Sequence, residues 1–377
     1  MMPVYLNNAA TSWPKAPQVG GTVAAYISGL PHHAGRSGFA GPDVPGACRN
    51  LLAGLLQVKD SNRIVFSPNA THALNIALHG IRWRTGAVVV TTVAEHNSVL
   101  RPLYYLSKSR GIAVQLVPVD KMGRVNPEEW EAALQKHKPQ AVVFTHASNV
   151  TGAVNDAALL TRMAKQAGAI TLMDASQSLG IVPVLPEAWG IDLVAFTGHK
   201  YLLGPTGTGG LYIAPDVDLE PVWVGGTGIQ SDLEEMPVSM PIRFEAGTPN
   251  DPAFAGLSTA LAWGLEHVLE DNNILHKTER LAAGLAELGA DVILVEPPRT
   301  PVISFTLKDW PVEDVGELLY QGFKIVCRTG LHCAPKIHAY LGTATAGTVR
   351  FSLSRFTTDR EIEYCLTAIG ELMHETV

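Results

Sequence analysis

The stretch LMDASQSLGIVPVLPEAWGIDLVAFTGHKYLLGPTG, residues 172–207, includes parts of two short apolar runs, each followed by a reactive side chain. The first run, residues 169–173, stops at Asp174, and the second, residues 192–196, stops shortly before Lys200. Runs of this length and composition predict buried β-strands. In an α/β sheet, ligands bind beyond the carboxyl ends of the strands, so we expect Asp174 and Lys200 to face one crevice.

An acid and a lysine in one crevice are the two groups that pyridoxal 5'-phosphate (PLP) requires. The carboxylate can hold the pyridinium nitrogen, and the amine can form a Schiff base. Most lysines point into water without a chemical role, but Lys200 follows a buried run and is flanked by Gly198 and Gly204. Partial desolvation would lower its pKa and favour both Schiff-base formation and abstraction of an α-proton. For Asp174, the alternative is a simple helix cap.

The composition is that of a globular protein, and a chain of 377 residues suits two domains. Hydrophobic residues make up 46% and charged residues 17%, and the net charge of −7 argues against a large basic surface for nucleic acid. No apolar run approaches the roughly 20 residues that span a membrane. The first residues do not resemble a signal peptide, and the four cysteines lie far apart. We therefore expect a cytoplasmic protein with reduced thiols.

Short apolar runs alternate with amphipathic segments over most of the chain, which predicts an α/β fold with a mainly parallel, seven-stranded sheet flanked by helices. Strands are expected at residues 63–66, 87–92, 113–119, 141–146, 169–173, 193–196 and 209–213. Helices are expected between them, at residues 71–79, 98–109, 127–136 and 157–166. Residues 220–252 are rich in Gly, Pro and acids, which indicates a loop.

The rest of the chain indicates a smaller α+β unit. A long helical pattern covers residues 254–288, with a bend expected near residues 271–273. It is followed by strands near residues 302–306, 324–328 and 348–352, and by helices at residues 312–321 and 359–374. We predict a large domain of residues 15–265 and a small domain of residues 266–377, which also includes the N-terminal segment 1–14.

Other candidate cofactor contacts stand at strand ends and helix starts. Ala70 and Thr71 begin a helix after a strand, where free N–H groups and the Thr71 hydroxyl would suit a phosphate. On its own, this pattern is better explained as an ordinary helix cap. Thr197 and His199, beside Lys200, could add donors to the phosphate and the ring.

Three more polar residues could contact a PLP ring or the substrate. Gln177, about one helical turn after Asp174, could reach the phenolic oxygen of the cofactor. His96 could stack on the pyridine ring, although a solvent-facing histidine at a helix start is the alternative. Asn149, at the end of a predicted strand, could contact either the cofactor or the substrate.

The segment RTGLHCAP, residues 328–335, holds a candidate nucleophile. Cys333 lies in a turn-like stretch where a thiol can be exposed, and His332 or a polar cofactor could favour its thiolate. An inert loop thiol is the alternative. The other cysteines are expected in the core: Cys48, Cys327 and Cys365.

Arg350 alternates with apolar neighbours on a predicted strand. It is either a surface residue or a buried clamp that binds a substrate carboxylate with two parallel hydrogen bonds. A metal site is not expected, because His332, Cys333 and His338 match no tetrahedral zinc spacing.

Motifs along the chain resemble the class V aminotransferase branch of the fold-type I PLP enzymes, most closely the group II cysteine desulfurases and selenocysteine lyases. The resemblance covers residues 4 to 370, and its motifs occur in order: YLNNAAT from Tyr5, EHN from Glu95, SNVTG from Ser148, DASQ from Asp174 and GHK from Gly198. Each motif alone is loose, but their joint order and spacing are specific.

The resemblance implies a role for each candidate. Lys200 would form the Schiff base, Asp174 would hold the pyridinium, and His96 would stack on the ring and act in catalysis. Residues 328–335 resemble the RxGxHCA loop, whose cysteine, here Cys333, takes the sulfur. Cofactor contacts, mainly to the phosphate, are implied for Ala70, Thr71, Thr197, His199 and, in the partner subunit of a homodimer, Thr248. Asn149 would contact the cofactor or the substrate, and Arg350 would clamp the substrate carboxylate.

The implied activity is conversion of L-cysteine to L-alanine, with the sulfur passing to Cys333 as a persulfide and then to a thiol or an acceptor protein. A selenocysteine lyase, a cysteine sulfinate desulfinase, or another class V aminotransferase or epimerase are alternatives. A non-catalytic protein that binds a sulfur carrier is less favoured. The chain departs from the family pattern at Asn7, where aspartate is frequent, and in residues 69–72, where a Gly-Thr-Thr run and an acid are common.

Overall fold

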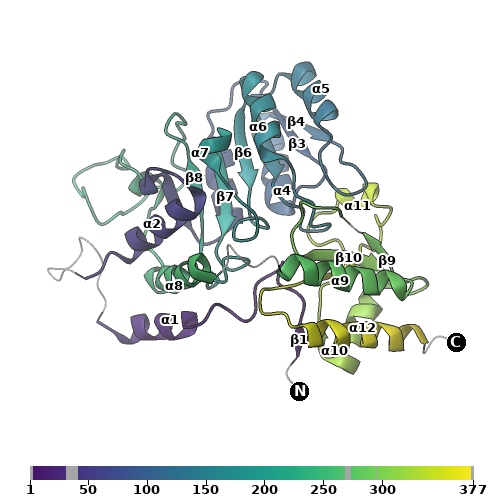
Figure 1. Ribbon diagram of the computed structural model, residues 1–377. Coiled ribbons are helices and arrows are strands. Elements are labelled where there is room, and N and C mark those ends of the chain that lie inside the picture. The colour runs from purple at the N-terminus through teal and green to yellow at the C-terminus, as the bar shows by residue number, and fades with distance from the viewer. Residues whose placement is uncertain (1–2, 31–40, 268–272, 294, 375–377) are drawn as a thin grey trace.

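The computed structural model describes residues 3–30, 41–267, 273–293 and 295–374 (Figure 1). At its centre is a seven-stranded sheet in the order β2-β8-β7-β6-β5-β3-β4. Its strands are β2 (Ile64–Ser67), β3 (Val88–Thr92), β4 (Ala113–Val117), β5 (Ala141–Thr145), β6 (Ile170–Asp174), β7 (Leu193–Thr197) and β8 (Gly209–Ile213). Strands β4, β3, β5, β6 and β7 pair in parallel, whereas β8 is antiparallel to both β7 and β2. All seven predicted strands are confirmed.

Helices cover both faces of this sheet because its strands are apolar on both sides. One face packs against α2 (Val44–Leu56), α5 (Pro127–His137), α6 (Ala157–Gln166) and α8 (Asp251–His267). The other face packs against α3 (Ala70–Gly80) and α4 (Asn97–Arg110). Neighbouring strand residues face opposite sides: Val65 lies with α3 and α4, whereas Ile64 and Phe66 lie with α2 and α8.

A second core lies in the C-terminal part, at the lower right of Figure 1. It is built on the sheet β12-β10-β9 and the pair β1-β11. The strands are β1 (Val4–Tyr5), β9 (Asp291–Ile293), β10 (Val302–Thr306), β11 (Ile325–Val326) and β12 (Val349–Ser352). The helices are α9 (Asn273–Glu287), α10 (Val312–Phe323) and α12 (Asp359–His374), whereas the short α11 (Ile337–Tyr340) packs against the core of the large sheet through Ile337.

The N-terminal segment joins this second unit, because β1 pairs in parallel with β11 and Asn7 bridges to Ser352. The long helical pattern after residue 254 forms two helices, α8 and α9. The bend expected near residues 271–273 falls mostly outside the described residues. The domain boundary near residue 265 stays a prediction.

A close backbone contact sets the start of α3. Ser67 pairs with Gly209 across β2 and β8, and a Cβ atom on Gly209 would lie 2.8 Å from the Cα of Asn69. Only glycine allows this approach, so Gly209 lets the start of α3 lie directly against β8. The helix start is thereby held at the same end of the sheet as Asp174 and Lys200.

Candidate active site

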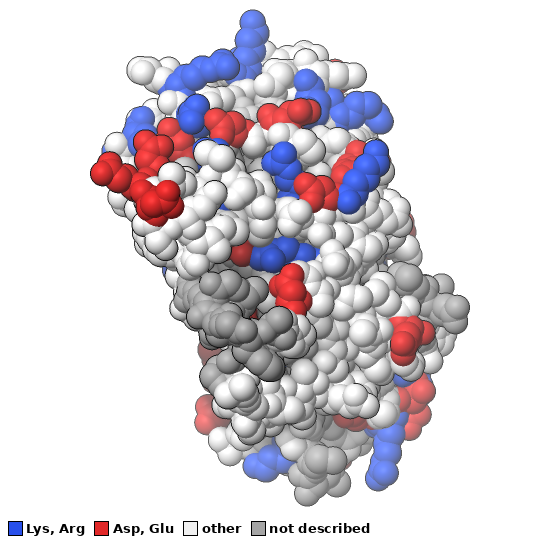
Figure 2. Space-filling view, turned by 90° about the vertical axis from the view of Figure 1, so that its left-hand side faces the viewer, with Lys and Arg blue, Asp and Glu red and all other residues white. Residues whose placement is uncertain are grey.

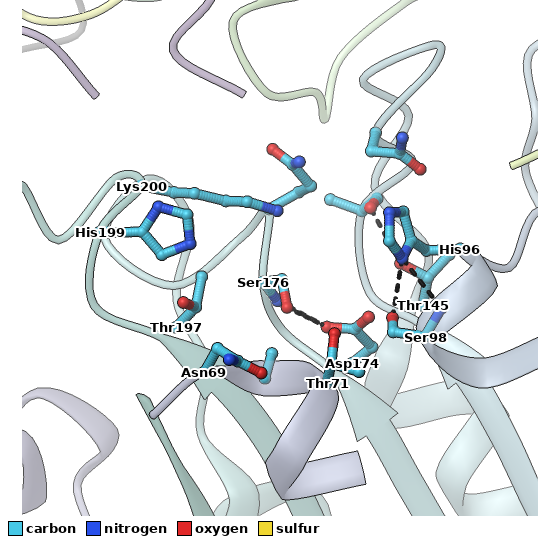
Figure 3. Close-up of a pocket in the computed structure, with 14 residues that line it drawn as sticks. Asn69, Thr71, His96, Ser98, Thr145, Asp174, Ser176, Thr197, His199 and Lys200 are labelled. Carbon is cyan, nitrogen blue, oxygen red and sulfur yellow. Dashed lines mark hydrogen bonds between the residues drawn. The ribbon is translucent and has the colours of Figure 1, made fainter. Parts of the chain in front are cut away.

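A cavity of about 450 Å³, open to solvent, lies at the carboxyl ends of β5, β6 and β7 (Figure 3). Its lining comes from strand ends, helix starts and the loop after β7: Asn69, Ala70, Thr71, His96, Ser98, Thr145, Ala147, Asn149, Asp174, Ser176, Gln177, Thr197, His199 and Lys200. Every predicted cofactor contact except Thr248 is among these residues. Thr248 is exposed and lies outside the cavity lining.

Asp174 ends β6 and is 4% exposed. Its Oδ1 accepts a hydrogen bond from the backbone N–H of Ser176 at 2.9 Å and another from the Ser176 hydroxyl. These bonds fix the orientation of the carboxylate at the cavity floor (Figure 3).

Lys200 extends into the cavity from the loop that follows β7 (Figure 3). Burial is the main cause that lowers its pKa from 10.5 to about 8; the Asp174 and Cys333 charges oppose this shift, and the Arg350 and Arg328 charges add to it. The amine is therefore neutral in a much larger fraction of molecules at neutral pH than that of a surface lysine. Such an amine is a competent nucleophile and base.

The start of α3 offers donors to an anion. Asn69 caps this helix, with its Oδ1 accepting from the N–H of His72 at 2.9 Å, and the N–H groups of Ala70 and Thr71 belong to the first turn, where they have no acceptor within the helix. The Thr197 hydroxyl, which donates to the Thr208 carbonyl at 3.3 Å, also lines the cavity.

His199 and Gln177 each bury a polar atom that has no hydrogen-bond partner among the described residues: His199 Nδ1 and Gln177 Oε1. Burial, followed by the charges of Lys200 and Lys15, lowers the pKa of His199 to about 4. Gln177 is held from its other end, where Nε2 donates to the Ala9 carbonyl at 2.9 Å. Both unsatisfied atoms belong to side chains that line the cavity, where a polar ligand could supply the missing partner.

Cys333 is partly exposed and lies in a tight loop that two other segments hold in place. The Asn149 side chain donates to the His332 carbonyl at 2.7 Å, and the Asn97 N–H donates to the Cys333 carbonyl at 2.7 Å. The φ angles of His332 and Cys333, 49° and 58°, lie in the left-handed region that non-glycine residues seldom adopt. A guanidinium N–H of Arg328 contacts Cys333 Sγ at 3.0 Å.

Arg350 is fully buried on β12. Its Nη1 donates to the Asn149 carbonyl at 2.8 Å, and its Nη2 donates to Asn7 Oδ1 at 3.3 Å. Burial, and then the charge of Arg328, lowers the pKa of Arg350 to about 10. Among the described residues, no carboxylate pairs with this guanidinium, so it is free of a competing anion.

Sequence reasoning gave no role to Arg328, although it is the first residue of the RxGxHCA motif. It also missed other residues of the cavity lining: Asn69, Ser98, Thr145, Ala147 and Ser176. Ser98 stands two residues after His96 at a predicted helix start, where serine often takes part in capping, and that spacing was the available signal. In the described part of the chain, no group of three or more His, Cys, Asp and Glu residues is placed to hold a metal ion.

The residues of the cavity fit PLP. Asp174 suits a pyridinium nitrogen, Lys200 suits an aldehyde carbon, and the unsatisfied atoms of His199 and Gln177 call for polar partners. The free N–H groups at the start of α3 suit a phosphate. The sheet, the lysine and the acid together define an enzyme of fold type I.

The chain belongs to the aminotransferase class-V family, whose model matches residues 4–365. A probable cysteine desulfurase of Methanothermobacter thermautotrophicus is 34% identical over 337 residues, which cover 87% of this chain and 82% of the relative. A probable cysteine desulfurase of Pyrococcus abyssi is 32% identical over 340 residues, with 86% and 82% covered. The solved cysteine desulfurase of Thermococcus onnurineus superposes with a TM-score of 0.90 at 28% identity, covering 99% of this chain and 95% of that one.

Proposed function

We propose that this enzyme is a PLP-dependent cysteine desulfurase that converts L-cysteine to L-alanine and leaves the sulfur on Cys333. The observation that carries the proposal is the position of Cys333: its Sγ contacts Arg328 at 3.0 Å, and its loop is held by Asn149, which lines the cavity. A thiol held beside this cavity has a direct use in sulfur chemistry and none in simple transamination. The cysteine desulfurases among the relatives support the same activity.

Bound PLP would supply an electron sink for the bonds at the substrate Cα and would weaken the bond from Cβ to sulfur. Asp174 would bind the pyridinium nitrogen of PLP, and Gln177 would bind its phenolic oxygen. His96 would stack on the PLP ring, and Lys200 would attach to PLP covalently. The phosphate would be held by Ala70, Thr71, Thr197, His199 and Thr248 of a second subunit.

The chain's own residues account for the remaining steps. Arg350 and Asn149 bind the substrate carboxylate, which fixes the Cα–H bond toward Lys200. Lys200 takes the α-proton on its neutral amine. The Cys333 thiolate then attacks the substrate sulfur: a sulfur–sulfur bond forms, the Cβ–sulfur bond breaks, and Cβ keeps the electron pair and is protonated to the methyl group of alanine. The persulfide sulfur is passed to a thiol or an acceptor protein.

A homodimer would bring Thr248 of one subunit to the cavity of the other. The 220–250 segment that carries Thr248 exposes apolar side chains, with Trp223 at 53%, Val224 at 72% and Val238 at 83% exposure. Figure 2 shows a broad area without charged side chains on one face of the molecule. The exposed apolar side chains of the 220–250 segment support a subunit contact. In the described part of the chain, no helix is both long and apolar enough to cross a bilayer. The cytoplasmic location is a separate proposal, which rests on the widely spaced cysteines.

The test compares wild type with Cys333→Ala and Lys200→Ala, measuring alanine and sulfide released from L-cysteine in the presence of a reducing thiol. We expect both products from wild type and a loss of both with either variant. Full activity of Cys333→Ala would show that Cys333 is not the nucleophile. Parallel assays with selenocysteine and cysteine sulfinate separate the lyase and desulfinase alternatives, and a lack of reaction with all three substrates would favour a non-catalytic protein.

A further inference from the structure

Helix α4 begins with a histidine as its N-cap. His96 Nδ1 lies 3.0 Å from the backbone nitrogen of Ser98 and 2.8 Å from the Ser98 hydroxyl oxygen (Figure 3). A backbone N–H can only donate a hydrogen bond, so His96 Nδ1 is the acceptor and carries no proton. Because the Ser98 hydroxyl meets the same unprotonated nitrogen, the hydroxyl must donate as well. Both donors of Ser98 therefore converge on one lone pair.

This arrangement determines the other nitrogen. A neutral imidazole with an unprotonated Nδ1 carries its proton on Nε2. His96 lines the cavity, and its Nε2 forms no hydrogen bond with any residue in the described ranges. The N–H at Nε2 is therefore a donor available to a group bound in the cavity.

We propose that Ser98 is a positioning residue that fixes His96 as the Nε2–H tautomer, so that His96 donates a hydrogen bond into the cavity and takes up no proton there. The inference rests on the proposed function and deepens it. It assigns proton transfer at the substrate to Lys200 and leaves His96 the task of binding the group on which negative charge develops.

A role as a base at Nε2 would be costly for His96. The proton would have to move to Nδ1, which would break the bond from the Ser98 N–H, leave this buried donor without its acceptor, and force the Ser98 hydroxyl to turn from donor to acceptor. A doubly protonated ring would also carry a proton on Nδ1, so it too would lose the hydrogen bond from the Ser98 N–H. It also places a positive charge at the start of a helix, which the helix dipole disfavours.

Burial and most of the charged groups around His96 also favour the neutral ring. Burial acts most strongly and, together with the charges of Lys200, Arg328 and Arg350 and against that of Asp174, lowers the pKa of His96 to about 4. The neutral ring is thus favoured at neutral pH independently of the cap. The hydrogen bonds to Ser98 then decide which nitrogen carries the proton.

The same helix start also holds the nucleophile loop. The N–H of Asn97, between His96 and Ser98 in the sequence, donates to the Cys333 carbonyl at 2.7 Å. One turn of α4 therefore orients the donor of His96 and the backbone of Cys333 together. Loss of the Ser98 hydroxyl would remove one of the two donors to His96 Nδ1 without removing this contact to the Cys333 loop.

Nuclear magnetic resonance on the full-length, cofactor-free protein labelled with 15N-histidine tests the tautomer directly. Long-range proton–nitrogen correlations distinguish the two tautomers, and the His96 signals are assigned by their loss in His96→Gln. We expect an unprotonated Nδ1 and a protonated Nε2 that do not change between about pH 5.5 and about pH 8.5. A protonated Nδ1, or protonation of the ring near its ordinary pKa, would overturn the proposal.

Two variants isolate the hydroxyl of Ser98. Ser98→Ala keeps the N–H donor and removes the hydroxyl, so the His96 titration midpoint is expected to rise and some Nδ1–H tautomer to appear. Ser98→Thr keeps both donors and is expected to behave like wild type. A merely structural role would change the melting temperature without moving the titration, and an unchanged tautomer in Ser98→Ala would refute the role of the hydroxyl.

The outcome is separable from the proposed function. If alanine and sulfide are formed from L-cysteine but His96 carries its proton on Nδ1, only the tautomer inference fails. If the tautomer is Nε2–H but neither product is formed, the desulfurase proposal fails and the role of Ser98 stands.

Discussion

Arg328 and Arg350 lie opposite one another across an antiparallel bridge, in which the Arg350 N–H donates to the Arg328 carbonyl at 2.7 Å. The two guanidinium groups serve different neighbours: Arg328 contacts Cys333 Sγ, and Arg350 contacts the Asn149 carbonyl. Among the described residues, neither is paired with a carboxylate. One short bridge thus places two free cations beside a thiol and a cavity, where a thiolate and a substrate carboxylate would each find a partner.

The contact between Arg328 and Cys333 predicts a reactive thiol. Iodoacetamide alkylates the thiolate, which a neighbouring guanidinium stabilises. Replacing the cation in Arg328→Gln should slow alkylation of Cys333 at neutral pH several-fold, up to about tenfold, since a hydrogen bond to a charged group contributes on the order of 1.5 kcal/mol. Arg328→Lys keeps the charge, so its alkylation rate at Cys333 should fall less than that of Arg328→Gln. Peptide mass spectrometry on cofactor-free protein measures the rates, and equal rates for wild type and Arg328→Gln would contradict this prediction.

Arg350 is expected to control substrate binding more than cofactor binding. Arg350→Lys keeps a charge but loses the planar pair of donors, so the KM for L-cysteine should rise about tenfold or more. The visible absorbance of lysine-bound PLP should remain. Arg360→Lys, on the exposed start of α12, is the matched control and should leave both measurements unchanged. A KM equal to that of wild type would show that the substrate carboxylate binds elsewhere.

The lowered pKa of Lys200 predicts how cofactor loading depends on pH. Only the neutral amine attacks an aldehyde, so the rate of PLP attachment to cofactor-free protein should rise with pH and level off above about 8. Because the Asp174 charge raises this pKa, Asp174→Asn should shift the midpoint to lower pH. The rate is read from the growth of the visible band after mixing. A midpoint near 10.5, the ordinary value for lysine, would refute the assigned environment.

The central sheet could be predicted from sequence because six of its seven strands are largely buried and read as mainly apolar runs; the edge strand β4 is more exposed. Each predicted strand lies within two residues of the observed one at either end, and Asp174 and Lys200 follow their strands as expected. Elements without a strong local pattern were missed. Strand β1 has only two residues and depends on β11, more than 300 positions away, and α2 contains two glycines and a proline that weaken its helical signal.

The relation of the site residues to one another was harder to predict than their identity. The motif around Cys333 named the thiol, but the contact from Arg328 arises because His332 and Cys333 both adopt left-handed backbone angles, which their residue types do not favour. The capping role of His96 was also missed, since Ser, Thr, Asp and Asn are the usual caps. The contact from Arg328 thus depends on a loop conformation that no local pattern encodes, whereas the spacing of His96 and Ser98 was a local signal of an unusual cap.

Glu95 lies completely buried between β3 and β5, close enough to Asp174 for their charges to interact. Its Oε1 accepts hydrogen bonds from the Thr92 hydroxyl at 2.6 Å and the Thr145 N–H at 3.0 Å, and its Oε2 has no partner among the described residues. Burial outweighs the opposing hydrogen bonds from Thr92 and Thr145 and, with a smaller contribution from the Asp174 charge, raises the pKa of Glu95 from 4.5 to about 8. The acid is therefore neutral in the folded protein at pH 7.

This neutral acid predicts a pH-dependent stability. Between about pH 4.5 and about pH 8 the unfolded chain has lost the Glu95 proton while the folded chain retains it, so the free energy of unfolding should fall as pH rises through this window and level off above it. Glu95→Gln keeps an Oε1 acceptor and has no proton to lose. Its free energy of unfolding, relative to that of wild type, should therefore increase as pH rises. Glu95→Ala should be destabilised throughout, because Thr145 loses its acceptor. Denaturant unfolding of the cofactor-free protein at pH values spanning this window measures the difference, and a Glu95→Gln curve parallel to that of wild type would mean that Glu95 is already ionised in the folded protein.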